Sequence, residues 1–172
     1  MTVLADLLRP GLDVVFVGTA VATASAERGH YYSGRGNRFW QLLYEAHFTP
    51  KLLRPEDDAT LPDLGIGITD LVKDVAQSHD RGLDYSKAGS VASHVEAVSP
   101  RWAAFNGLTA ARAAAARWLH KARPEGLGEQ SWRLGESRVF VLPSSSGAHA
   151  AMRYEEKLRW WTDLADRAYA GR

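Results

Sequence analysis

Short runs of β-branched and aromatic residues alternate along the chain with segments of helical periodicity, and this alternation constrains the fold most. It predicts a mainly parallel sheet, because each right-handed crossover between parallel strands places its helix on a face of the sheet. We therefore expect an α/β fold, a three-layer α/β/α sandwich around a central four-stranded sheet. The expected strands are Asp13–Val17, Ile66–Thr69, Arg101–Phe105 and Arg138–Leu142.

The segments between these strands predict the helical layers. Asn37 is expected to cap a helix that continues to about His47, with its aromatic residues at helical spacing. The proline-containing, acidic stretch Pro50–Leu64 predicts an irregular surface connection. Further helices are expected over Ser86–Val98, Leu108–His120 and Glu155–Ala168.

Composition excludes several classes of protein. A chain of 172 residues with 45% hydrophobic and 24% charged residues fits a single globular domain, 1–172. The absence of cysteine excludes disulfides, thiolate nucleophiles and iron–sulfur clusters, and the six histidines lack metal-ligand spacing, so we expect neither metal nor cofactor. No apolar run reaches the roughly 18 residues that span a membrane, and no secretion signal is recognised. We expect a cytoplasmic monomer with no membrane partner.

Net charge does not decide whether nucleic acid is a partner, because 21 basic residues are nearly balanced by 20 acidic ones. The placement of polar residues is more informative. The carboxyl ends of parallel strands meet at one edge of a sheet, where ligands bind. Four polar loops follow the expected strands there: Gly18–Gly36, Thr69–Asp70, Asn106–Gly107 and Ser144–His149.

Residues 29–40, GHYYSGRGNRFW, resemble the first site region of the mismatch-specific uracil/thymine-DNA glycosylases. The resemblance extends in order from about Leu8 to Leu164. It implies the uracil-DNA glycosylase fold, uracil-containing DNA as partner and free uracil as product. The further matching blocks are Asp57–Pro62, Gly65–Val72, Phe105–Gly107 and Leu142–Ser146.

Two departures from the family pattern affect function. The family follows its first strand with Gly-Ile-Asn-Pro-Gly, whose Asn holds the attacking water, whereas Gly18–Ala22 reads GTAVA and places Ala20 at that position. In the last loop the family inserts Arg or Leu into the space left by the flipped base, and here Ala148 is followed by His149.

The resemblance implies a base-binding role for the first and third loops. Tyr32 matches the aromatic residue on which the flipped base stacks, and an amide such as that of Asn106 can read the O4 and N3 edge of uracil. For Asn106 the alternative is a turn residue, since Asn-Gly is a common turn pair. Base-binding positions are Gly18, Thr19, Ala20, Tyr32, Asn37 and Asn106.

The last loop is expected to contact DNA. Hydroxyl and backbone N–H groups of residues 144–146 could hold the phosphates that flank the flipped nucleotide. The alternative is a polar turn with helix-capping serines. The expected DNA-binding residues are Ser144, Ser145, Ser146, Ala148 and Arg153.

With Ala20 unable to hold water, other groups must do so. Asp70 is the first candidate, because a carboxylate can orient water and stabilise a positively charged sugar. Its alternative role is to cap the following segment. Thr69 and His149 complete the catalytic candidates, and His149 could instead contact phosphate or remain solvated.

These residues predict a monofunctional glycosylase that flips uracil out of DNA, hydrolyses its N-glycosidic bond and leaves an abasic site. The alternative is a non-catalytic DNA-damage binding protein on the same fold, which Ala20 favours. A nucleotide-binding protein of similar architecture is a third possibility, but Gly18–Ala22 has neither phosphate-binding glycine pattern.

Overall fold

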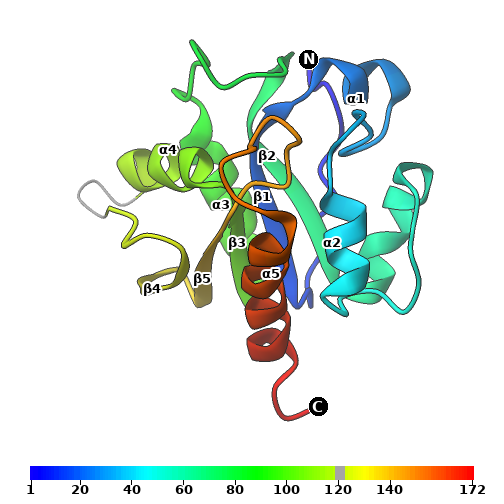
Figure 1. Ribbon diagram of the computed structural model, residues 1–172. Helices are drawn as coiled ribbons and strands as arrows, with labels where there is room; N and C mark the ends of the chain where they lie inside the picture. The colour runs from blue at the N-terminus through cyan, green and yellow to red at the C-terminus, as the bar shows by residue number, and fades with distance from the viewer. Residues whose placement is uncertain (119–122) are drawn as a thin grey trace.

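The computed structural model describes residues 1–118 and 123–172, and at its centre lies a five-stranded sheet (Figure 1). The strand order is β2-β1-β3-β5-β4, in which the first four strands are parallel and β4 pairs antiparallel with β5. The expected α/β fold is confirmed. The strands are β1 (Val14–Val21), β2 (Ile66–Ala76), β3 (Trp102–Asn106), β4 (Gly128–Leu134) and β5 (Ser137–Leu142).

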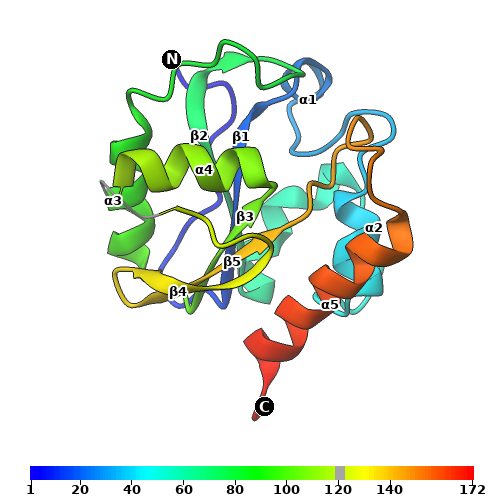
Figure 2. The ribbon, with the colours of Figure 1, turned by 60° about the vertical axis from the view of Figure 1, so that its left-hand side comes forward.

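Helices cover both faces of the sheet, which makes the three layers that the alternating pattern predicts (Figure 2). Helices α3 (Ala88–Val98) and α4 (Leu108–Trp118) pack together on one face. The other face is covered by α2 (Phe39–Glu45), α5 (Tyr154–Tyr169) and the 3₁₀ helix η1 (Pro55–Leu64). A short helix, α1 (Thr23–Arg28), follows β1.

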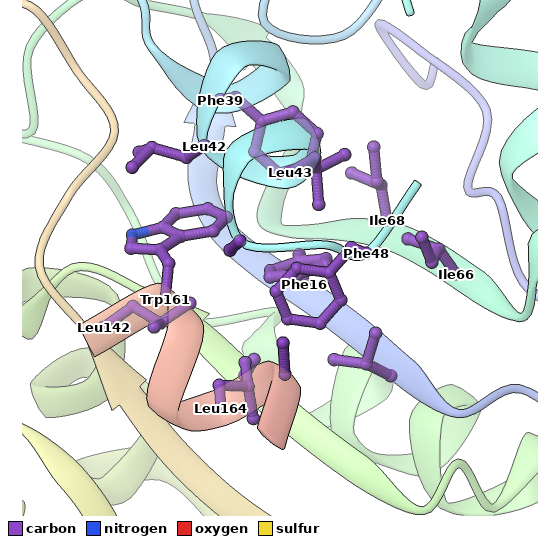
Figure 3. Close-up of a cluster of buried hydrophobic side chains, with 14 of the residues drawn as sticks. Phe16, Phe39, Leu42, Leu43, Phe48, Ile66, Ile68, Leu142, Trp161 and Leu164 are labelled. Carbon is purple, nitrogen blue, oxygen red and sulfur yellow. The ribbon is translucent and has the colours of Figure 1, made fainter. Parts of the chain in front are cut away.

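Strand β1 is buried on both faces, and its alternating side chains divide the core in two. Phe16 faces α2 and α5, where its ring stacks on Trp161 with centroids 5.3 Å apart and meets Phe39 edge-on at 5.4 Å (Figure 3). Val15 and Val17 point to the opposite face and pack under α3 and α4. The run of apolar residues at the start of β1 therefore serves both halves of the core.

The structure has one more strand than the four expected from the sequence. Strand β4 lacks the run of β-branched and aromatic residues that marks a strand in sequence, since it contains Glu129, Gln130, Ser131 and Arg133. It forms because it pairs with β5 at the sheet edge, where one side of the backbone ladder needs no partner.

Several element boundaries also differ from expectation. Strand β1 continues to Val21 and β2 to Ala76, because the two strands remain paired well beyond the apolar run. Within the expected Gly18–Gly36 loop lies α1, and within the expected irregular connection lies η1. The helix expected to reach His120 is described as far as Trp118, and residues 119–120 lie outside the described residues.

Candidate active site

The carboxyl ends of the parallel strands surround a cavity of about 580 Å³. The cavity brings together all the site residues expected from the sequence except Thr69 and Arg153. Those that line it are Gly18, Thr19, Ala20, Tyr32, Asn37, Asp70, Asn106, Ser144, Ser145, Ser146, Ala148 and His149.

Thr69 does not line the cavity. It is fully buried, and its hydroxyl donates to Asp6 Oδ1 at 2.8 Å and accepts from Lys73 Nζ at 2.7 Å. Successive residues of a strand point to opposite faces, so the strand that presents Asp70 to the cavity turns Thr69 away from it. The structure therefore does not support a catalytic role for Thr69.

Arg153 also lies outside the cavity. It stands immediately before α5, with its side chain 80% exposed and 3.8 Å from the Glu155 carboxylate. The sequence places it four residues after His149, but the chain turns away between the two. Any contact of Arg153 with DNA would be made beyond the edge of the cavity.

Tyr32 lies at the cavity wall in a left-handed backbone conformation, with φ at 51°. Its ring stacks on Phe39 with centroids 4.1 Å apart. The hydroxyl is buried beside Asn106 without a hydrogen bond of normal geometry in the described chain. Burial, and secondarily the Asp70 carboxylate, raises the pKa of Tyr32, so the hydroxyl stays protonated.

The backbone around Tyr32 is held by a carboxylate from η1. Asp58 accepts the N–H of Tyr31 at 3.0 Å and lies 3.2 Å from Nδ1 of His30. Trp40 Nε1 donates to the Tyr31 carbonyl at 3.2 Å. His30 thus takes part in the contacts that hold the chain leading into Tyr32 and its left-handed backbone.

Asp70 reaches the cavity floor from β2, directly beside Gly18 of β1 in the strand register. A Cβ placed on Gly18 would lie 2.5 Å from Asp70 Oδ1 and 3.1 Å from the Tyr32 hydroxyl. Burial raises the pKa of Asp70 to about 7, with Lys73 opposing the shift and Asp6 adding to it. The carboxyl can therefore gain or lose a proton near neutral pH.

Asn106, Ser145 and Asn37 form a hydrogen-bond chain that ties three loops together. Asn106 Nδ2 donates to Ser145 Oγ at 2.9 Å, and Ser145 N donates to Asn106 Oδ1 at 2.9 Å. Ser145 Oγ donates in turn to Asn37 Oδ1 at 3.0 Å, which also accepts the N–H of Phe39. Asn37 was expected to cap α2, but the N-cap residue is Arg38, and Asn37 binds the first N–H of the helix from one residue earlier. Asn106 retains one amide hydrogen and one lone pair for a ligand.

The last loop satisfies part of its backbone with its own serines. The Ser144 hydroxyl accepts the N–H of Ser146 at 3.1 Å, and the Ser146 hydroxyl accepts that of Ala148 at 3.2 Å. His149 Nδ1 is buried without a hydrogen-bond partner among the described residues. Burial, and secondarily Lys157, lowers the pKa of His149, so its imidazole is neutral at pH 7.

The β2–α3 loop and the start of α4 form a wall of the cavity that the sequence did not predict. Thr19 Oγ1 donates to Asp80 Oδ1 at 2.6 Å, which joins this loop to the end of β1. No motif marks these positions, because their proximity depends on the unexpected length of β1 and β2. The additional lining residues include Gln77, Ser78, His79, Asp80, Leu108, Thr109 and Arg112.

Residues 1–118 and 123–172 contain neither a metal-ligand cluster nor a membrane-spanning helix. No cluster of three or more His, Cys, Asp or Glu side chains there could hold a metal ion. No helix among them is both long and apolar enough to pass through a bilayer.

The chain is similar to known proteins both in fold and in sequence family. A solved structure with a TM-score of 0.66 is a "putative Uracil DNA glycosylase" from Methanosarcina acetivorans, 22% identical, and the match covers 94% of this chain and 96% of that one. At this identity the likeness shows a shared fold. The family model described as the uracil DNA glycosylase superfamily matches residues 5–165. Because that match spans nearly the whole sequence, the chain belongs to the uracil DNA glycosylase superfamily.

Proposed function

We propose that this protein is a monofunctional uracil-DNA glycosylase, which flips uracil out of DNA, hydrolyses its N-glycosidic bond and leaves an abasic site. One observation carries the proposal: a single cavity brings together the Tyr32 ring, the Asn106 amide and the Asp70 carboxyl. These three groups can stack, read and hydrolyse an extruded pyrimidine nucleotide. The family's role in DNA repair makes uracil-containing DNA the proposed partner.

Base binding would use groups whose positions are already set. Tyr32 is fixed on one face by Phe39, and stacking of the base on its exposed part contributes about 1–3 kcal/mol. The remaining donor and acceptor of Asn106 match the N3 and O4 edge of uracil. Both bonds to Ser145 fix the orientation of that amide before substrate arrives, which reduces the entropy lost on binding.

Hydrolysis would use Asp70 in its ionised form. Water attacks C1′ of the deoxyribose, the bond between C1′ and N1 breaks, and the bonding electron pair leaves with uracil. The carboxylate orients this water, accepts its proton and stabilises the positive charge that develops on the sugar. Neutral His149, which also lines the cavity, is available to hydrogen-bond the departing base.

A second candidate is a protein that binds damaged DNA without cleaving it. Ala20 favours this alternative, because its methyl group cannot hold the water that the family's Asn holds at that position. The same loops would then recognise an extruded base or an abasic site. The difference between the two candidates therefore lies in whether Asp70 replaces the missing amide.

The test is release of free uracil from a duplex containing a single uracil, measured beside binding of the same duplex. The glycosylase proposal predicts release by the wild-type protein and a loss of about 10²-fold or more in Asp70→Asn, with binding retained. Binding without release would establish the damage-binding alternative. A protein that neither binds nor cleaves the duplex would contradict both candidates.

A further inference from the structure

A buried lysine lies beneath the last loop of the cavity. Lys157, on α5, is only 4% exposed, and its ammonium donates to the His149 carbonyl at 2.9 Å and the Ser146 carbonyl at 3.4 Å. No carboxylate in the described part of the chain lies within 4.0 Å of it. A buried charge of this kind is costly unless it is compensated.

The groups around Lys157 do not balance its charge. Arg38 approaches from the loop before α2, and burial, and secondarily Arg38, lowers the pKa of Lys157. His149 is neutral and contributes no negative charge. Glu45, the acidic residue of α2, already accepts hydrogen bonds from Gln41 Nε2 and the Tyr154 hydroxyl. The surroundings of the last loop are therefore positive in the absence of a ligand.

The carbonyl contacts of Lys157 also fix where the neighbouring N–H groups point. In a planar trans peptide the carbonyl and the N–H of the next residue point in opposite directions. The His149 carbonyl faces the ammonium, and so, at a longer distance, does the Ser146 carbonyl, which also accepts the N–H of His149 at 3.1 Å. The N–H groups of Ala150 and Gly147 therefore point away from the lysine. Both residues are exposed, and neither N–H has a partner among the described residues.

We propose that Lys157 is a positioning residue for a phosphodiester group of the bound DNA. Its ammonium holds the His149 carbonyl and, together with the His149 N–H, the Ser146 carbonyl, and so aims the N–H groups of Ala150 and Gly147 at a phosphate beside the flipped nucleotide. The phosphate in turn balances the buried charge. The inference rests on the proposed function, because it takes DNA as the ligand.

The test compares Lys157→Met with Arg159→Met. Arg159 is an exposed residue two positions further along α5, so the control removes the same formal charge from the same helix. The probe is a duplex with a tetrahydrofuran abasic analogue, whose binding is followed by fluorescence anisotropy over a range of salt concentrations. Lys157→Met is expected to weaken binding about tenfold or more and to reduce the log–log salt slope by about 0.9, as expected for one lost phosphate neutralisation.

Thermal unfolding separates positioning from a purely structural role. Methionine fills the space of the lysine stem and removes a buried charge, so the Tm of the free Lys157→Met protein should stay equal to or above that of the wild type. Lys157→Arg keeps the charge and should preserve most of the salt slope. A lower Tm with an unchanged salt slope in Lys157→Met would show that the lysine only stabilises the fold, and it would overturn the proposal.

The remaining outcomes distinguish this inference from the proposed function. Normal duplex binding by wild type and an equal affinity and salt slope in Lys157→Met would overturn the positioning role alone. An equal loss in Arg159→Met would show a general charge effect and would also overturn it. A wild-type protein that binds no duplex would overturn the proposed function and this inference with it.

Discussion

The Asp70 carboxyl packs directly against the Cα of Gly18, so closely that a Cβ on that glycine would lie 2.5 Å from Oδ1. The strand register explains the contact, because Gly18 of β1 pairs with Asp70 of β2 at the point where both enter the cavity. Only a residue without a side chain leaves room for the carboxyl there. The glycine thus determines where the proposed catalytic group stands.

Substitution of that glycine should displace the carboxyl. In Gly18→Ala the added methyl must move Asp70 Oδ1, and overpacking of this kind costs about 1–3 kcal/mol. We expect uracil release to fall about tenfold or more, while duplex binding changes less because no phosphate contact is lost. Single-turnover rates and anisotropy on the same duplex check this. Release at the wild-type rate would show that the position of Asp70 does not matter.

Asp70 should also make the fold less stable above neutral pH. Burial holds the pKa of Asp70 at about 7 in the folded protein, above the value of 3.8 in the unfolded chain. Its contribution to stability is therefore fully present below pH 3.8 and is lost as the pH rises through about 7.

In Asp70→Asn this loss should disappear, and the variant should exceed the wild type in unfolding free energy by roughly 2–4 kcal/mol at about pH 8. Urea unfolding at several pH values measures the difference. The two proteins should converge toward acidic pH. A parallel pH dependence in both would show that the carboxyl is ionised normally in the folded state.

Ser145 is expected to couple stability to base recognition. The fully buried hydroxyl bonds to both Asn106 and Asn37, so Ser145→Ala leaves two amide groups without that partner. The expected cost is about 1–3 kcal/mol in urea unfolding, with weaker uracil binding because Asn106 loses its fixed orientation. The control is Ser144→Ala, since that hydroxyl accepts only a bond within its own loop. Equal effects in both variants would rule out a special role for Ser145.

The Tyr32 ring should matter more than its hydroxyl. The hydroxyl lacks a hydrogen bond of normal geometry in the described chain, so Tyr32→Phe should keep the affinity for uracil-containing duplex within about twofold. Tyr32→Ala removes the surface for the base and should weaken binding by about 1–3 kcal/mol, or roughly 5- to 150-fold. Fluorescence anisotropy with a uracil-containing duplex and an undamaged duplex of the same sequence tests both variants. A large loss in Tyr32→Phe would assign base reading to the hydroxyl instead.

Strands β1 and β4 show how far the sequence could predict this fold. The apolar start of β1 is buried on both faces, a pattern that residue types alone reveal. Strand β4 is polar and forms through pairing with β5, which no local pattern encodes. The parallel sheet was therefore predictable, whereas its antiparallel edge was not.

The candidate site likewise contains residues that the sequence could place and residues that it could not. Polar residues after each buried strand could be assigned to one edge, because parallel topology brings those ends together, and Tyr32 and Asn106 do meet in one cavity. Thr69 was expected at the cavity because the second strand was expected to end there, whereas β2 continues to Ala76 and turns Thr69 away from the cavity. Asp80 was missed because its contact with Thr19 depends on how far β1 and β2 extend.

The pH dependence of single-turnover uracil release tests whether ionised Asp70 replaces the missing amide in hydrolysis. Burial places the pKa of Asp70 at about 7, and the carboxyl must lose its proton to act. We expect the wild-type rate to rise with pH and to level off above about 7, whereas Asp70→Asn should be slow and independent of pH across the same range. Wild-type release that is independent of pH and equal in Asp70→Asn would show that Asp70 takes no part in hydrolysis.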